Sequence, residues 1–409
     1  MPYNSFGGRR SGGPSRPSFG GNGGNFRSRR PSNGGGRRGP KKDYIDPTRF
    51  VRVAKPTEEE KYVAVHKFND FDIHPVLKAN IEAKGFTAPS PIQDQTIPLG
   101  LDGKDVIGIA NTGTGKTVAF AIPVLQRLAT SRDGKALIVA PTRELAQQIQ
   151  VEMRALGRGA RVYDATLIGG KPMGPQLRDL ERNPRLIIGT PGRIKDHLER
   201  RSLDLSDFDM VVLDEVDRML DMGFVNDVRA LLAQLSPQRQ SFFFSATLDN
   251  RVKDLIQTFA PDAITVSVKT GDTSENVHQN VVRFGSPADK IDLLHDILNQ
   301  DIVSKVIIFD DTQRSVEKLS QDLRGRGFNA DAIHGGKSQG QRSRALRSFK
   351  ENEITILVAT DVAARGIDVA DVSHVINFST PQSYEDYVHR IGRAGRAGKI
   401  GHALTFIEQ

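Results

Sequence analysis

The sequence predicts two α/β domains in tandem, each built on a parallel sheet, after a disordered tail rich in arginine and glycine. From about Phe68 onward, short apolar runs alternate with longer amphipathic segments, and the runs form two series separated by a polar stretch. The first 40 residues, by contrast, hold almost nothing apolar. We therefore expect a tail and linker at 1–65, a first domain at 66–268, a linker at 269–276 and a second domain at 277–409.

The tail carries the basic charge of the chain. Residues 1–42 hold eight Arg, two Lys and no acid, whereas the rest of the chain holds 47 basic and 49 acidic residues. Arginine attracts phosphate, and the interspersed Tyr3, Phe6, Phe19 and Phe26 can stack on bases, so the tail is a candidate RNA-binding arm of low specificity. The alternative is a solubilising tail with no specific partner.

Several classes of function are excluded by composition. The chain of 409 residues has no cysteine, which rules out disulfides, thiolate nucleophiles and cysteine-based zinc sites. No run approaches about 18 consecutive apolar residues, and no signal peptide is apparent, so we expect neither a membrane span nor secretion.

Each domain is expected to contain five buried strands, because continuous apolar runs joined by helices are typical of parallel sheets. The first series is Asp105–Ala110, Ala136–Ala140, Leu186–Thr190, Met210–Leu213 and Ser241–Phe244. The second series is Val306–Phe309, Ala330–His334, Ile354–Ala359, His374–Phe378 and Ala403–Ile407. Many of these runs end in polar clusters, where open α/β sheets bind ligands.

The loop after the first run has the order of a phosphate-binding P-loop: strand, glycine-rich turn, Lys-Thr, helix. Its residues are Ala110, Asn111, Thr112, Gly113, Thr114, Gly115, Lys116 and Thr117, followed by an expected helix over Thr117–Leu128. Lys116 would reach the β- and γ-phosphates and Thr117 would bind Mg²⁺. Ala110 replaces the usual first glycine of the motif.

Two carboxylates directly follow the buried run Met210–Leu213. Burying such charges is costly unless they handle a cation or a proton. We expect Asp214 to be a Mg²⁺ ligand and Glu215 to act as the base or orienter for attacking water.

Together with these elements, further motifs make the chain resemble the DEAD-box RNA helicase family over about Phe68–Gln409. They are Gly85–Gln93, Pro141–Ala146, Gly169-Gly170, Thr190–Arg193, Ser245–Thr247, Thr360–Asp368 and His389–Arg396. The family's Asp-Glu-Ala-Asp reads Asp-Glu-Val-Asp here, so Val216 puts the local packing in question but not the chemistry. The resemblance implies two RecA-like P-loop domains that bind ATP and Mg²⁺.

The resemblance also implies roles for individual residues. Phe68, Phe86 and Gln93 would recognise adenine, and Gly366 and Asp368 would contact the ribose side. Arg393 and Arg396 would face the γ-phosphate, whereas Ser245, Thr247, Asp217 and His389 would couple the lobes, the first two by hydrogen bonds to Asp214 and its polar neighbours. The residues implied to contact an RNA backbone are Pro141, Thr142, Arg143, Gly170, Thr190, Arg193, Gln339, Arg342 and Thr360.

The function that we expect is ATP-dependent, RNA-stimulated separation of short RNA duplexes or remodelling of RNA–protein complexes by a cytoplasmic monomer. One alternative is a related two-lobe helicase that acts on DNA, against which Gln93, Pro141–Ala146 and Ser245–Thr247 argue. The other is a non-catalytic RNA chaperone that uses its basic tail. Intact Lys116, Asp214, Glu215 and Arg396 argue against that second alternative.

Overall fold

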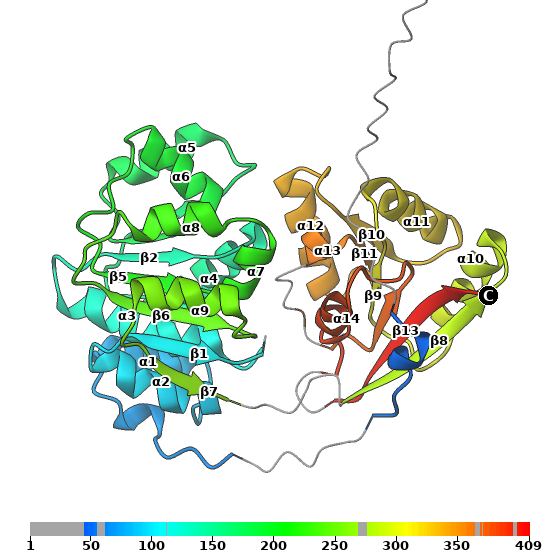
Figure 1. Ribbon diagram of the computed structural model, residues 1–409, viewed down its shortest axis with the longest axis horizontal. Coiled ribbons are helices and arrows are strands. Elements are labelled where there is room, and N and C mark those ends of the chain that lie inside the picture. Colours follow the sequence, from blue (N-terminus) through cyan, green and yellow to red (C-terminus); the bar gives the residue numbers. More distant parts are fainter. Residues whose placement is uncertain are drawn as a thin grey trace, which may run out of the picture. The chain divides into compact units, whose positions relative to one another are not determined.

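The computed structural model describes residues 45–54, 62–111, 113–268, 276–364, 369, 371–395 and 399–409 (Figure 1). Several sequence-based expectations lie outside these ranges and are not addressed by it. They concern the tail up to residue 44, the linker at 269–275, Thr112, Gly366, Asp368 and Arg396.

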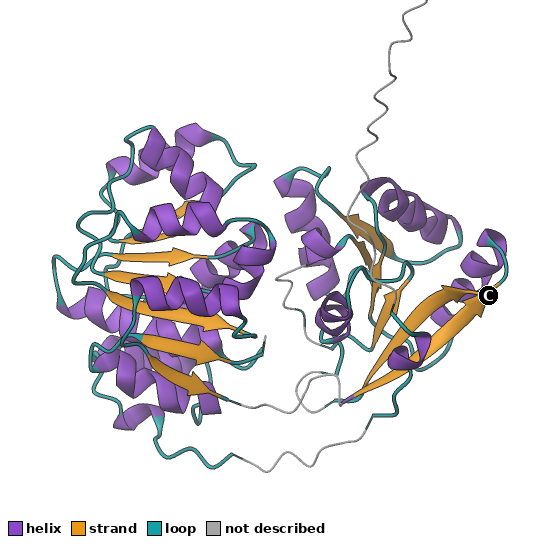
Figure 2. Ribbon diagram, viewed as in Figure 1, coloured by secondary structure: helices purple, strands orange, loops and turns teal. Residues whose placement is uncertain are grey.

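The first lobe is built on a seven-stranded parallel sheet with the order β3-β4-β2-β5-β6-β1-β7. Its strands are β1 (Val106–Ile109), β2 (Ala136–Val139), β3 (Asp164–Leu167), β4 (Leu186–Gly189), β5 (Met210–Leu213), β6 (Gln240–Ser245) and β7 (Ile264–Ser267). The central strands are buried because helices cover both faces of the sheet (Figure 2).

One apolar cluster joins the sheet to η2 (Phe68–Asp70), α1 (Pro75–Ala83), α2 (Pro91–Leu101), α3 (Lys116–Thr130) and α4 (Arg143–Leu156). The cluster on the other face includes α6 (Pro191–Glu199), α7 (Val216–Asp221), α8 (Val225–Leu232) and α9 (Asn250–Phe259), with α5 (Met173–Glu181) at its margin. Val216 is fully buried in this second cluster, so the lobe has room for the branched side chain.

The second lobe contains a six-stranded parallel sheet with the order β10-β11-β9-β12-β13-β8. Its strands are β8 (Val277–Phe284), β9 (Val306–Phe309), β10 (Ala330–Ile333), β11 (Ile356–Ala359), β12 (His374–Asn377) and β13 (Gly401–Glu408). Helices α10 (Pro287–Leu298) and α11 (Gln313–Gly325) cover one face, and α12 (Gln339–Lys350), α13 (Asp361–Ala364) and α14 (Tyr384–Ile391) cover the other.

The fold class predicted from the sequence is confirmed, but three strands were missed. These are β3, β7 and β8, and each lies at the edge of its sheet. Edge strands are covered on fewer sides, and accordingly their sequences mix polar with apolar residues instead of forming continuous apolar runs. The helix after the P-loop also extends further than expected, over Lys116–Thr130.

Residues 45–54 differ from the expected disordered tail. Pro47–Phe50 form a 3₁₀ helix, η1, whose N-terminus is capped by the side chain of Asp46, and Phe50 is completely buried against the second lobe. Among the described helices, none combines the length and the apolar character that a membrane span requires.

Candidate functional site

The P-loop lies between β1 and α3 and is shaped by two glycines with left-handed backbone angles. Gly113 has φ 87° and Gly115 has φ 94°, a region that other residues adopt only at a cost. A Cβ atom on Gly115 would lie 2.3 Å from Nε2 of Gln93, so both the angle and the space require glycine there. The first backbone N–H groups of α3 consequently face an open turn that suits a phosphate.

Lys116 folds back over this loop. Its Nζ donates a hydrogen bond to the Ala110 carbonyl oxygen at 2.9 Å, and the side chain is buried. Gly113, Gly115, Lys116, Thr117, Asp214 and Glu215 line one pocket. The structure therefore brings together the residues that the sequence assigned to phosphate, metal and water.

Gln93 links α2 to the P-loop. Its Nε2 donates to the Gly115 carbonyl oxygen at 3.1 Å and its Oε1 accepts from the backbone N–H of Ser90 at 2.9 Å. The Ser90 hydroxyl adds a bond to the carbonyl oxygen of Thr114 at 2.8 Å. The amide oxygen and the amide nitrogen can each make one more hydrogen bond. Gln93 can therefore contact a base while it stays hydrogen-bonded to the P-loop.

The two candidate adenine-stacking rings have different environments. Phe68 is buried in the apolar core, and its ring centroid lies 6.1 Å from that of Phe86 at an interplanar angle of 29°. Phe86 is only partly buried, so it is the ring of the pair with surface left for a base.

The acidic pair follows β5 directly and is buried. Burial raises the pKa of Asp214 to about 6, although the positive charge of Lys116 opposes the shift. Burial would also raise the pKa of Glu215, but the charges of Arg218 and Lys116 outweigh it and hold that pKa below its ordinary value. Glu215 therefore stays ionised, as a proton acceptor must. Its backbone is left-handed, with φ 54°.

Arg218 is a residue that the sequence analysis missed. Its NH1 donates to Oε2 of Glu215 at 2.6 Å, and both side chains are buried. The spacing of three residues at a helix start could have indicated the pair.

The donor set fits Mg²⁺. Asp214 is a buried carboxylate whose charge its surroundings disfavour, and a divalent cation would stabilise that charge. Mg²⁺ typically takes one or two protein oxygens and completes its shell with phosphate and water. Thr117, on the first turn of α3 and in the same pocket, has a hydroxyl that could serve as a second oxygen ligand.

The Ser245–Thr247 turn was expected to bond Asp214 and its polar neighbours; the bonds are made to one of these neighbours, Asp217, and not to Asp214. The carboxylate Oδ2 of Asp217 accepts from the N–H of Ala246 at 3.0 Å, the N–H of Thr247 at 2.9 Å and the Thr247 hydroxyl at 3.1 Å. The Ser245 hydroxyl accepts from the Asp217 N–H at 3.3 Å. The reason is geometric: Asp217 is the second residue of α7 and faces the end of β6, whereas Asp214 lines the P-loop pocket with Lys116.

The candidate RNA-binding residues of the first lobe lie just beyond strand ends. Pro141 and Thr142 follow β2, and the hydroxyl of Thr142 caps α4. The guanidinium of Arg143 lies against Gly169 and Gly170, so close that a Cβ on Gly170 would be 2.0 Å from NH1.

Thr190 and Arg193 occupy a similar position after β4. Thr190 is the N-cap residue of α6, and Arg193 donates from NH1 to the Lys171 carbonyl oxygen at 3.0 Å. Lys171 directly follows Gly170, so the two loops are joined.

In the second lobe, Thr360 follows β11 and accepts backbone bonds from Ala363 and Ala364. His389 lies on α14, and Arg393 lies two residues beyond the end of that helix. Arg390, between them, has a structural role: its guanidinium is fully buried and donates to both carboxylate oxygens of Asp361, at 2.6 and 2.7 Å.

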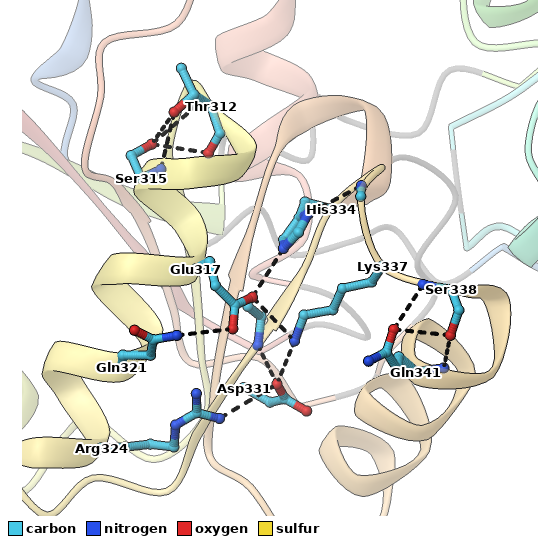
Figure 3. Close-up of polar contacts among 12 residues, drawn as sticks. Thr312, Ser315, Glu317, Gln321, Arg324, Asp331, His334, Lys337, Ser338 and Gln341 are labelled. Atoms are coloured by element: carbon cyan, nitrogen blue, oxygen red, sulfur yellow. Dashed lines mark hydrogen bonds and ion pairs between the residues drawn. The ribbon is translucent and has the colours of Figure 1, made fainter.

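A polar network missed by the sequence analysis supports the loop that leads into α12 (Figure 3). The Nε2 of His334 lies 3.0 Å from Oε2 of Glu317, and the ammonium of Lys337 lies 3.0 Å from Oδ1 of Asp331. The hydrogen bond from His334 is the first cause that lowers the pKa of Glu317. The network fixes the turn just before the RNA candidates Gln339 and Arg342 in α12.

Comparison with known proteins matches these features to one family. The DEAD/DEAH box helicase model matches residues 90–255, and the helicase conserved C-terminal domain model matches residues 289–398. The Bacillus subtilis protein DEAD-box ATP-dependent RNA helicase CshA is 44% identical over 342 residues, which is 83% of this chain and 69% of that protein. The chain belongs to the DEAD-box ATP-dependent RNA helicase family.

Solved structures agree with this assignment. Mss116p bound to single-stranded RNA and AMP-PNP has a TM-score of 0.75 at 31% identity, covering 85% of this chain and 76% of that chain. Saccharomyces cerevisiae Dbp5 bound to RNA and ADP BeF₃ has a TM-score of 0.74 at 30% identity, covering 84% and 90%. The chain spans about two thirds of the length of these CshA relatives, for example 66% of the Listeria monocytogenes protein.

Proposed function

We propose that this DEAD-box protein binds single-stranded RNA with both lobes and hydrolyses ATP to separate short RNA duplexes or remodel RNA–protein complexes. The observation that carries the proposal is the buried acidic pair beside the P-loop lysine, with Glu215 held ionised by Arg218. An ionised carboxylate next to a phosphate-binding loop suits attack of water on a phosphoryl group.

In the proposed reaction, the P-loop N–H groups and Lys116 bind the β- and γ-phosphates. Glu215 orients a water molecule and accepts its proton as the new P–O bond forms and the bond to the bridging oxygen breaks. Thr117 and Asp214 would hold Mg²⁺, which neutralises charge on the phosphates when bound.

The second lobe would complete the site. Arg393 and Arg396 would stabilise charge on the transferred phosphoryl group, and Gly366 and Asp368 would contact the ribose side. Because these arginines belong to a separate lobe, ATP would hold the lobes together and hydrolysis would release them.

RNA would be bound through its sugar-phosphate backbone. The candidate loops offer hydroxyls, arginines and glycines, which suit phosphate better than base edges, so base sequence should matter little. We expect affinity that falls steeply with salt. RNA would be preferred through contacts to the 2′-hydroxyl.

The central test is Glu215→Gln in the full chain, with Glu181→Gln on an exposed part of α5 as the matched control. The Glu215 variant should keep ATP and RNA binding but lose turnover by at least about 100-fold, while the control behaves like wild type. Normal turnover in Glu215→Gln would remove this residue from its role.

Two further measurements separate this function from its rivals. Stimulation of ATP hydrolysis by RNA but not by DNA would exclude the DNA helicase. Deletion of residues 1–42 should lower RNA affinity and leave ATP-dependent strand separation intact, which a chaperone that depends on its tail would not do. We further propose that the protein acts as a monomer in the cytoplasm, where its RNA substrates are found; sedimentation would test the first point.

A further inference from the structure

The segment 45–54 is bound to the lobe that carries the arginine motif. Arg52 forms an antiparallel bridge with Gln279 of the edge strand β8: its N–H donates to the Gln279 carbonyl oxygen at 3.0 Å, and the reverse bond is 2.7 Å. The N–H of Ala54 donates to Nδ1 of His278 at 3.1 Å. In Figure 1 this first described segment, in blue, lies beside β8 and β13.

The same segment is packed against α14. The ring of Phe50 is completely buried, with its centroid 4.7 Å from that of Tyr387. The guanidinium of Arg49 lies 3.7 Å from the centroid of the Tyr384 ring, a cation–π contact. The Tyr387 hydroxyl donates to Oε1 of Gln279 at 2.9 Å, so helix, strand and segment meet at one point.

The turn after α14 rests on the strand that the segment pairs with. Gly395 has φ 67°, and a Cβ there would lie 2.9 Å from the Val277 side chain and 3.0 Å from the Asn276 carbonyl oxygen. Phe50, Val277 and Ala394 belong to one apolar cluster. The turn that contains Arg393 therefore follows α14 in the sequence and packs against β8. The segment 45–54 contacts both of these elements.

We propose that residues 45–54 are a positioning element for the arginine-bearing turn, with Phe50 and Arg49 as its principal contacts. This inference rests on the proposed function, because it assigns to Arg393 and Arg396 the stabilisation of the transferred phosphoryl group. A small displacement of a group that acts in the transition state lowers turnover much more than it lowers ground-state binding. ATP itself is held by the P-loop of the first lobe.

The test compares Phe50→Ala, Phe50→Leu and the control Val53→Ala in the full chain. Val53 belongs to the same segment but its side chain is 72% exposed. RNA-stimulated ATP hydrolysis is measured, and AMP-PNP binding counts the intact sites. Phe50→Ala should lower kcat by about 10- to 100-fold with KM for ATP changed less than about threefold. Phe50→Leu should recover most of the loss, and Val53→Ala should equal wild type.

A second variant guards against misfolding of Phe50→Ala. Arg49→Ala removes the contact to Tyr384 while it leaves the buried Phe50 ring in place, and it should lower kcat about threefold or more with a much smaller change in melting temperature than Phe50→Ala. Unchanged kcat per AMP-PNP site in both variants would overturn the inference, including the case in which only the melting temperature falls. A wild-type chain without RNA-stimulated hydrolysis would instead overturn the proposed function on which the inference depends.

Discussion

Asp217→Asn tests the hydrogen bonds that join the start of α7 to the turn after β6. The substitution keeps the shape of the side chain but replaces one acceptor oxygen by a donor. In the wild-type protein every bond to this carboxylate is accepted: three at Oδ2, and one at Oδ1 from the N–H of Arg218 at 2.9 Å. An amide in this place must therefore direct its NH₂ group at another donor.

The less costly orientation keeps the carbonyl toward Ala246 and Thr247 and faces the NH₂ group to the Arg218 N–H. That buried N–H then lacks an acceptor, at a cost of about 1–3 kcal/mol, and three charge-assisted bonds become neutral, at about 1 kcal/mol each. Relief of the buried charge offsets part of this sum. We expect the first lobe to lose about 2–4 kcal/mol of stability.

Hydrogen exchange of amides in β5 and β6 measures this loss directly in the native protein. Strand separation per ATP hydrolysed should fall as well, because the hydrogen bonds that link the turn to the start of α7 become weaker. Asp207→Asn is the control, since that side chain is 79% exposed. An opening free energy in Asp217→Asn within 0.5 kcal/mol of wild type, on the order of a surface substitution, would refute the reasoning.

Two other predictions follow from particular contacts. Burial, and secondly the neighbouring His402, lower the pKa of His374 from 6.5 to about 4. The folded state therefore resists protonation of His374. Stability that is present above pH 6.5 is lost as the pH falls toward 4, and the loss is about 2 kcal/mol at pH 5. Calorimetry should show a weaker pH dependence of stability in His374→Phe than in wild type. Gly170→Ala should displace the guanidinium of Arg143 and weaken single-stranded RNA binding about tenfold in fluorescence anisotropy, whereas Gly174→Ala, where the nearest atom to a Cβ is 3.7 Å away, should not.

The buried parts of the fold were accessible from sequence because their signal is local. A strand such as β5, covered on both faces, must be apolar throughout, and the motifs follow directly at its end. The edge strands β3, β7 and β8 lacked this signal, since a neighbour on one side only leaves room for polar residues.

The sequence was enough to predict which residues form the site, but not which of them are hydrogen-bonded to one another. Asp214, Glu215 and Lys116 were assigned from their motifs, and the structure places them in one pocket. That Asp217, not Asp214, holds the Ser245–Thr247 turn depends on how α7 is oriented against β6, which no spacing in the sequence fixes. The docking of Phe50 depends on contacts more than 200 positions away along the chain.

The most direct measurement is a structure of the protein with AMP-PNP, Mg²⁺ and a short single-stranded RNA. The account predicts that Arg396 lies within hydrogen-bonding distance of the γ-phosphate, with Lys116 and Glu215 on the opposite side of it. An Arg396 side chain directed into solvent, away from the terminal phosphate, would contradict the account.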